Sequence, residues 1–268
     1  MDWKQFFDRL GMNGTRWQWR IMRWERQIKG VAQGQIPASE FVSLTKVLIA
    51  TNLILFSLMA VHGTLLGQGM RSILSPSTQL LVHWGGQFWP LVLNEGQWWR
   101  CLTYAFTHGG LIHLAFNMVV LYQIGGLIEA EIGLGRTLTL YTLTALTATL
   151  AGYYWHPMVP VVGASGSLFG LIGFAVVYYH RMGGPQGIHI RNFMFRWAVF
   201  AFIFGLVVGA DNAGHLGGAA GGALIGLFLP AGIRARKTLA PLFNVLALAS
   251  AAAIVVSLAL LAVSIISN

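Results

Sequence analysis

Long apolar runs, separated by short polar connections, dominate the sequence and predict a bundle of helices. Seven runs can be distinguished, and they cover approximately residues 47–66, 107–127, 137–155, 165–180, 195–210, 213–230 and 240–266. A helix needs about 20 apolar residues to cross the roughly 30 Å hydrocarbon layer of a bilayer. Because the runs are continuously apolar, and lipid offers no partner for open backbone groups, we expect helices rather than strands.

Composition supports the same interpretation. Of the 268 residues, 56% are hydrophobic and only 9% are charged. This leaves too little polar surface to cover a soluble globule of this length. The composition therefore excludes an ordinary soluble domain and predicts an all-α integral membrane protein.

Residues 1–45 differ from the rest because they mix aromatic residues with arginines. Trp17, Ile21, Trp24 and Ile28 follow helical spacing, which predicts a helix that lies on the cytoplasmic membrane surface. A soluble basic arm is the alternative. No short apolar core followed by a small-residue cleavage site is found here, so we expect the first apolar run to be an uncleaved anchor.

The basic residues predict the orientation. If the N-terminal arm is cytoplasmic, every Lys and Arg except Arg71 and Arg100 falls on the cytoplasmic side. The fourth and sixth runs then begin near the outer face. Topology and contact with anionic lipid explain the excess of 17 Lys and Arg over 8 Asp and Glu, so no nucleic acid partner is needed. The short loops and uncleaved anchor favour a prokaryotic plasma membrane, with organellar membranes as an open alternative.

The connection from about residue 67 to 106 is long for a membrane loop and rich in aromatic residues. Tryptophan and tyrosine prefer the boundary between lipid and water. We therefore expect this segment to fold back into the outer headgroup region and to wall one side of a cavity there.

Two polar residues open apolar runs. Ser165 begins the fourth run and His215 lies near the start of the sixth, where a hydroxyl and an imidazole are a candidate nucleophile and base. Small residues line both runs, at Gly166, Gly170 and Gly173 in one and at Gly214, Gly218, Gly222 and Gly226 in the other. Such ridges allow close helix packing, which would bring the two side chains together. In the alternative, the glycines serve packing alone, Ser165 caps its helix and His215 binds a backbone carbonyl.

The second run adds two candidate donors. His113 and Asn117 are four residues apart and share one helix face, with His108 just before them. Together with the backbone amides at the start of the fourth run, these side chains would surround a developing oxyanion. A metal at His113 is the competing interpretation, but that face offers no cysteine or carboxylate ligand. Asp211 precedes His215 by four positions, and we expect it to cap the helix, which leaves a Ser-His dyad without a triad.

Four motifs, in this order along the chain, resemble those of the rhomboid intramembrane serine proteases. They are Trp99-Arg100, His113-x-x-x-Asn117, Gly163-Ala-Ser165-Gly166 and Gly214-His215-x-x-Gly218. The resemblance covers about residues 46–235 and implies a six-helix core that cleaves transmembrane substrates near the outer membrane face.

The resemblance also implies residue roles. Ser165 would be the nucleophile, His215 the base, and His113 and Asn117, with the Ser165 amide, the oxyanion donors. Trp99 and Arg100 would belong to a structural first loop, and Phe169 stands where some members stack an aromatic ring on the base.

These features predict peptide-bond hydrolysis within the membrane. The expected organisation is a basic arm over residues 1–45, a rhomboid-like catalytic domain over 46–235 and an added C-terminal transmembrane helix over 236–268. Partners would be transmembrane protein substrates and membrane lipid, with no cofactor or metal. The alternatives are a rhomboid-like protein that binds membrane clients without cleaving them, and a transporter or channel.

Overall fold

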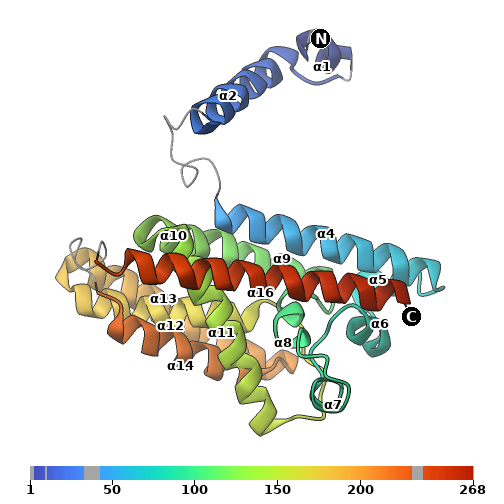
Figure 1. Ribbon diagram of the computed structural model, residues 1–268, viewed down its shortest axis with the longest axis vertical. Coiled ribbons are helices and arrows are strands. Elements are labelled where there is room, and N and C mark those ends of the chain that lie inside the picture. Colours follow the sequence, from blue (N-terminus) through green and yellow to red (C-terminus); the bar gives the residue numbers. More distant parts are fainter. Residues whose placement is uncertain (1–2, 10, 33–42, 231–237, 268) are drawn as a thin grey trace. The chain divides into compact units, whose positions relative to one another are not determined.

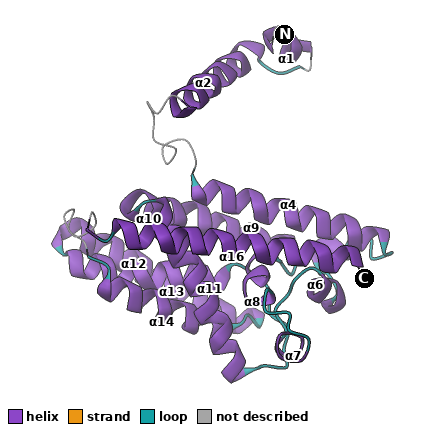
Figure 2. Cartoon of the chain, in the orientation of Figure 1, coloured by secondary structure: helices purple, strands orange, loops and turns teal. Residues whose placement is uncertain are grey.

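The computed structural model describes residues 3–9, 11–32, 43–230 and 238–267, and within these ranges it contains helices and no strand (Figures 1 and 2). The all-α prediction is therefore confirmed. The chain divides into two compact units, Met1–Ser43 and Leu44–Asn268.

The described residues of the first unit form two helices, α1 (Trp3–Arg9) and α2 (Gly14–Ala32), where we expected one. The Asp8 carboxylate accepts a hydrogen bond from the Gly14 N–H at 2.8 Å, and the ring of Phe7 stacks on Trp17 with centroids 5.0 Å apart. The location of this unit on a membrane surface stays a prediction.

The second unit is a bundle whose main helices coincide with the seven apolar runs (Figure 1). They are α4 (Leu44–Leu65), α9 (Leu111–Val120) continued through a π turn, η2 (Leu121–Gly125), into α10 (Gly126–Ile132), α11 (Leu134–Trp155), α12 (Ser165–Met182), α13 (Gly184–Val208), α14 (Asn212–Phe228) and α16 (Ala240–Ser267). Within the part of the chain that the structure describes, four helices are long and apolar enough to cross a membrane, at Leu44–Leu65, Leu111–Ile132, Gly184–Val207 and Ala240–Ser267. The count of seven spans stays a prediction.

The other three main helices are α11, α12 and α14, which pack against one another. Helix α11 is rich in threonine, and four of its hydroxyls donate to the carbonyl four residues earlier, those of Thr137, Thr139, Thr142 and Thr144. This satisfies the hydroxyls within the helix. Threonine and glycine lower the hydropathy of these helices, yet they suit an interior position because they keep neighbouring backbones close.

The segment between α4 and α9 folds into short helices, α5 (Arg71–Leu74), α6 (Thr78–His83), α7 (Trp89–Asn94) and α8 (Arg100–Thr103), followed by a 3₁₀ turn, η1 (Tyr104–Phe106). The buried Arg100 side chain donates to the carbonyls of Val82 and Gly86, and its guanidinium lies 4.5 Å from the ring centroid of Trp99. Arg100 thus links α8 to α6 and to the turn at Gly86.

The same segment contacts the approach to α12. Gln87 and Val161 exchange two backbone hydrogen bonds, of 2.9 and 2.8 Å, in an isolated antiparallel bridge. This pairing fixes the extended backbone four residues before Ser165.

Candidate active site

Backbone hydrogen bonds at two positions fix the segment before Ser165. Besides the Val161 bridge, the Gly163 N–H donates to the carbonyl of Tyr104 at 2.9 Å. Gly163 has φ of +121°, a conformation that L side chains rarely adopt, so glycine is required here. Ser165 then begins α12, and the preceding N-cap residue, Ala164, provides no side-chain cap. The backbone N–H groups of the first turn therefore remain available to an anion.

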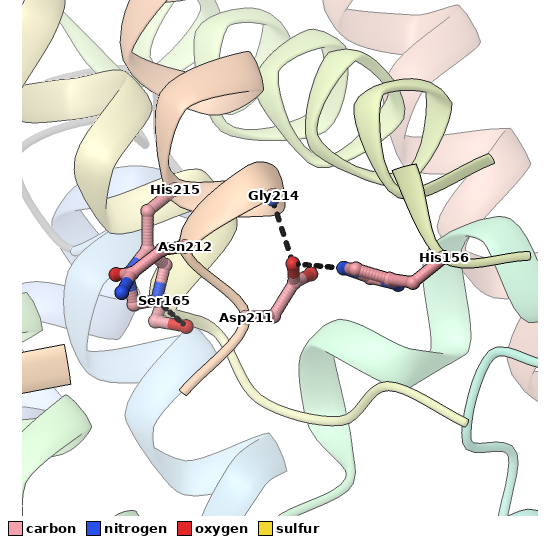
Figure 3. Close-up of polar contacts among 6 residues, drawn as sticks. All are labelled: His156, Ser165, Asp211, Asn212, Gly214 and His215. Carbon is pink, nitrogen blue, oxygen red and sulfur yellow. Dashed lines mark hydrogen bonds and ion pairs between the residues drawn. The ribbon is translucent and has the colours of Figure 1, made fainter. Parts of the chain in front are cut away.

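Ser165 and His215 meet across the α12–α14 interface. The Oγ of Ser165 lies 2.9 Å from Nε2 of His215, and the histidine is only 5% exposed (Figure 3). The two residues are 50 positions apart in the chain. A hydroxyl within hydrogen-bond distance of a buried imidazole is the geometry of a nucleophile and its general base.

Asn212 contacts the other side of the same ring. Its Oδ1 lies 3.1 Å from Nδ1 of His215, one turn earlier in α14 (Figure 3). An amide oxygen only accepts, so this contact places the imidazole proton on Nδ1 and leaves the Nε2 lone pair facing Ser165. Asn212 was not predicted from the sequence, although its position three residues before His215 on the same helix was a usable signal.

Close helix packing explains how the two side chains meet. A methyl group on Gly218 would overlap the carbonyl oxygen of Gly166, and one on Gly222 would overlap that of Gly170. The prediction of facing small-residue ridges is confirmed. Phe169, also on α12, stacks on the His215 ring at a centroid distance of 4.2 Å with 12° between the planes, so the base is held on one face as well.

The candidate oxyanion donors flank Ser165. His113 accepts a hydrogen bond at Nδ1 from the Gly109 N–H at 3.3 Å, so its neutral ring carries the proton on Nε2. That nitrogen lies beside Gly163, where a Cβ would approach it to 2.7 Å. Asn117, 1% exposed, uses one amide hydrogen on the carbonyl of His113 at 2.9 Å and retains the other.

A cavity of about 610 Å³ brings these groups together, because Ser165, His215, His113 and Asn117 all line it. The rest of its wall is mostly apolar and comes from α9, α12, α13 and the connections that precede α12 and α14. It includes Ile112, Phe116, Val159, Pro160, Val161, Val162, Phe169, Ala201, Phe204, Gly205, Gly209 and Ala210.

The last two lining residues, His156 and Asp211, form a second polar pair. Nε2 of His156 lies 2.8 Å from Oδ1 of Asp211 (Figure 3). Asp211 is the N-cap of α14, since the same oxygen accepts the Gly214 N–H at 2.8 Å. The predicted cap is confirmed, whereas the contact with His156 was not anticipated.

One expectation is wrong, and one alternative fails. None of residues 67–106 lines the cavity; the segment instead contacts the backbone that leads to Ser165, through the Gln87–Val161 bridge and the hydrogen bond from Gly163 to Tyr104. The alternative in which Ser165 caps its helix also fails, since Ala164 occupies that position.

His108 is fully buried with its ring 5.2 Å from that of His113, outside the cavity lining. No group of three or more metal-ligating side chains occurs among the residues that the structure describes.

Comparisons with known proteins agree with these observations. A family model described as the Rhomboid domain matches residues 95–232. The chain is 33% identical over 184 residues to Rhomboid protease GluP of Bacillus subtilis, with 67% of this chain and 33% of that protein covered. It is 29% identical over 172 residues to Rhomboid protease AarA of Providencia stuartii, covering 55% of this chain and 61% of that protein.

A third relative is named as inactive. Over 148 residues the chain is 28% identical to Inactive RHOMBOID-like protein 8 of Arabidopsis thaliana, covering 54% of this chain and 42% of that protein. All three alignments span less than two thirds of the relative's own length.

Proposed function

The chain belongs to the rhomboid family, and from this membership and the 2.9 Å contact between Ser165 Oγ and His215 Nε2 we propose that it is an intramembrane serine endopeptidase. It is a multi-pass membrane protein, so its substrates are proposed to be transmembrane proteins. The contact between nucleophile and base is the observation that carries the proposal.

Acylation begins at Ser165. His215 takes the hydroxyl proton on Nε2 while the oxygen attacks the substrate carbonyl carbon. The Asn212 carbonyl, 3.1 Å from Nδ1, keeps the ring in the required tautomer and orientation throughout. The protonated His215 then donates its proton to the leaving amine, the peptide C–N bond breaks and an acyl-enzyme remains.

The oxyanion formed in this step needs donors. His113 Nε2–H, the free amide hydrogen of Asn117 and the Ser165 backbone N–H supply them in this proposal. One preorganised donor can be worth about 3 kcal/mol in the transition state of acyl transfer. The uncapped first turn of α12 supports the same role, because its amides have no side-chain partner from the N-cap residue.

Deacylation needs water beside the acyl-enzyme. The 610 Å³ cavity provides the space, with His156 and Asp211 as further polar lining groups. His215 takes a proton from water, the hydroxide attacks the ester carbon, and Ser165 recovers its proton as the acid product leaves.

Substrate preference follows from backbone chemistry. The carbonyls of a transmembrane helix are hydrogen-bonded within the helix, so the segment must unwind before Ser165 can reach one. We expect substrates with helix-weakening Gly or Pro and, by family resemblance, a small residue before the cleaved bond.

The location of the enzyme is part of the proposal. The distribution of Lys and Arg supports a cytoplasmic N-terminus and an active site toward the outer face, in a prokaryotic plasma membrane. The catalytic domain is proposed to be residues 46–235, with 1–45 as a cytoplasmic arm and 236–268 as an additional transmembrane helix.

A client-binding protein without proteolysis is the second candidate, favoured by the relative that is named as inactive. Reconstitution in proteoliposomes separates the two. The chain should cleave members of a panel of transmembrane substrates that carry Gly or Pro, poorly cleave matched Leu-rich versions, and lose all cleavage in Ser165→Ala. Binding of panel members without cleavage by the wild-type chain would favour the second candidate. Equal cleavage of both substrate sets would contradict the unwinding requirement.

A further inference from the structure

His156 and Asp211 connect two parts of the site that the peptide chain does not join directly. Their side chains are 22% and 18% exposed and lie 55 positions apart. Asp211 Oδ1 accepts from both the His156 ring and the Gly214 N–H, each at 2.8 Å. Figure 3 shows the carboxylate between these two donors.

Each of the two residues lies at the junction of a helix and a connection that leads to or from the site. His156 ends α11 and opens the connection that leads to Ser165. Asp211 ends the connection from α13 and begins the helix whose first turn bears Asn212 and His215. One carboxylate oxygen therefore joins the nucleophile's connection to the base's first turn.

The rest of α14 is positioned differently. Gly218 and Gly222 lie against the carbonyls of Gly166 and Gly170, and these contacts begin one turn after His215. Before Asp211 the chain passes through Gly209, which has φ of +69°. The glycine contacts therefore leave the first turn to be fixed by other groups, and the Asp211 cap is one of them.

Among the described residues, the His156 ring makes no second hydrogen bond that would fix its position. Its Nδ1 is buried without a hydrogen bond partner among the described residues, which is a costly arrangement for a ring nitrogen. The bond between Nε2 and Asp211 therefore orients the His156 ring in spite of this cost.

We propose that this pair, which we name the His156–Asp211 latch, positions His215 for Ser165. The inference rests on the proposed protease function and adds two positioning residues to it. The latch holds the first turn of α14 at the hydrogen-bonding distance from Ser165, so that losing either side chain slows activation of the hydroxyl.

The test measures how fast a fluorophosphonate probe labels Ser165 in the purified full-length chain. Asp211→Ala and His156→Ala should each lower the rate constant about tenfold, with probe affinity and the final labelled fraction unchanged. An unfolded population would instead lower the final fraction. The double variant should be no slower than Asp211→Ala alone, because both changes break one connection.

Conservative variants keep the test sharp if the alanine variants fold poorly. Asp211→Asn retains the acceptor oxygen and His156→Gln retains a donor, so both should label within about threefold of wild type. Asp211→Asn also separates the hydrogen bonds from the negative charge, since Asp211 interacts electrostatically with His215. His62→Ala is the matched control, because it removes a histidine hydrogen bond, 2.9 Å from the Trp84 indole nitrogen, outside the cavity lining.

The outcomes are distinct. Unchanged rates in both alanine variants, effects that multiply in the double variant, or an Asp211→Asn rate as low as that of Asp211→Ala would each overturn the latch while the protease proposal stands. A wild-type chain that does not label, where a control membrane serine hydrolase does, would overturn both.

Discussion

Asn212 Oδ1 lies 3.1 Å from Nδ1 of His215, on the ring edge away from Ser165. An amide thus occupies the place that a carboxylate takes in a Ser-His-Asp triad. It fixes the tautomer as a carboxylate does, but it brings no negative charge to stabilise the imidazolium.

Replacing this amide should slow catalysis. In Asn212→Leu the ring keeps a neighbour of similar size but loses its acceptor, and we expect kcat to fall about fivefold to tenfold, in proportion to one neutral hydrogen bond. KM should change little. Asn212→Asp is the matched variant, because it retains the acceptor and should keep at least the wild-type kcat. Steady-state cleavage in detergent checks this, and an unchanged kcat in Asn212→Leu would remove Asn212 from the mechanism.

Phe169 offers a second way to disturb the base. Its ring is 4.2 Å from the His215 ring, and such stacked pairs contribute about 1 kcal/mol. Phe169→Leu should therefore lower kcat about fivefold. Phe169→Tyr keeps the stacked ring, and its hydroxyl can point into the cavity that residue 169 lines, so its kcat should stay close to wild type. Equal kcat values for the leucine and tyrosine variants would show that stacking is irrelevant.

The interface between α12 and α14 predicts a stability effect. A methyl group at position 222 would overlap the carbonyl oxygen of Gly170, so Gly222→Ala should lower the free energy of unfolding by about 1–3 kcal/mol. Labelling of Ser165 should fall with it, because the same interface brings the base to the nucleophile.

Gly126→Ala is the control for this experiment. Gly126 also lies in a helix, but a Cβ added there would meet no other group within 4 Å, so alanine should leave stability equal or slightly higher. Thermal unfolding in detergent measures both variants. Equal unfolding midpoints for Gly222→Ala and Gly126→Ala would contradict the close approach of the two backbones.

His108 predicts a pH dependence of stability. This residue lies in the turn before the span that begins at Leu111, and burial, followed by the charge of His113, lowers its pKa to about 3. The folded state therefore keeps His108 neutral at pH values where the unfolded chain, with a pKa near 6.5, takes up a proton. Above about pH 6.5 His108 is neutral in both states and does not make the free energy of unfolding depend on pH. Below that pH, proton uptake by the unfolded chain lowers the free energy of unfolding by about 1.4 kcal/mol for each pH unit, down to about pH 3.

The variant His108→Gln isolates this contribution. Between about pH 7.5 and 5.5 the unfolding free energy of the wild-type chain should fall more steeply than that of the variant, by about 1.4 kcal/mol. Parallel pH profiles for the two chains would show that His108 takes up no extra proton on unfolding.

Much of the fold followed from hydropathy alone. Seven apolar runs located the bundle helices to within a few residues at most ends, because lipid imposes a fixed length and a helical backbone. An exception is α13, which begins at Gly184, before the run that we placed at 195–210, because its first turns carry polar residues such as Gln186 and Arg191. The short helices of the segment between α4 and α9 were not predicted, since tertiary contacts such as those of Arg100 hold them in place.

The part of the site that depends on close packing of α12 and α14 could be predicted from the spacing of glycines. The ridges that include Gly218 and Gly166 pointed correctly to the meeting of Ser165 and His215. Asn212 and His156 were missed for different reasons. Asn212 lies in the first turn of the helix, where asparagine is common for reasons of helix capping alone. His156 contacts Asp211 because two loops lie side by side, and no spacing of residues along the sequence predicts such a contact.

The most direct test of the account is the mass of the intact purified protein after exposure to a fluorophosphonate. We predict one adduct in the wild-type chain, located by peptide mapping to Ser165, with no adduct in Ser165→Ala and strongly slowed formation in His215→Ala. An adduct that persists in Ser165→Ala, or a wild-type chain that stays unmodified while a control membrane serine hydrolase reacts, would contradict the claim that Ser165 is a nucleophile activated by His215.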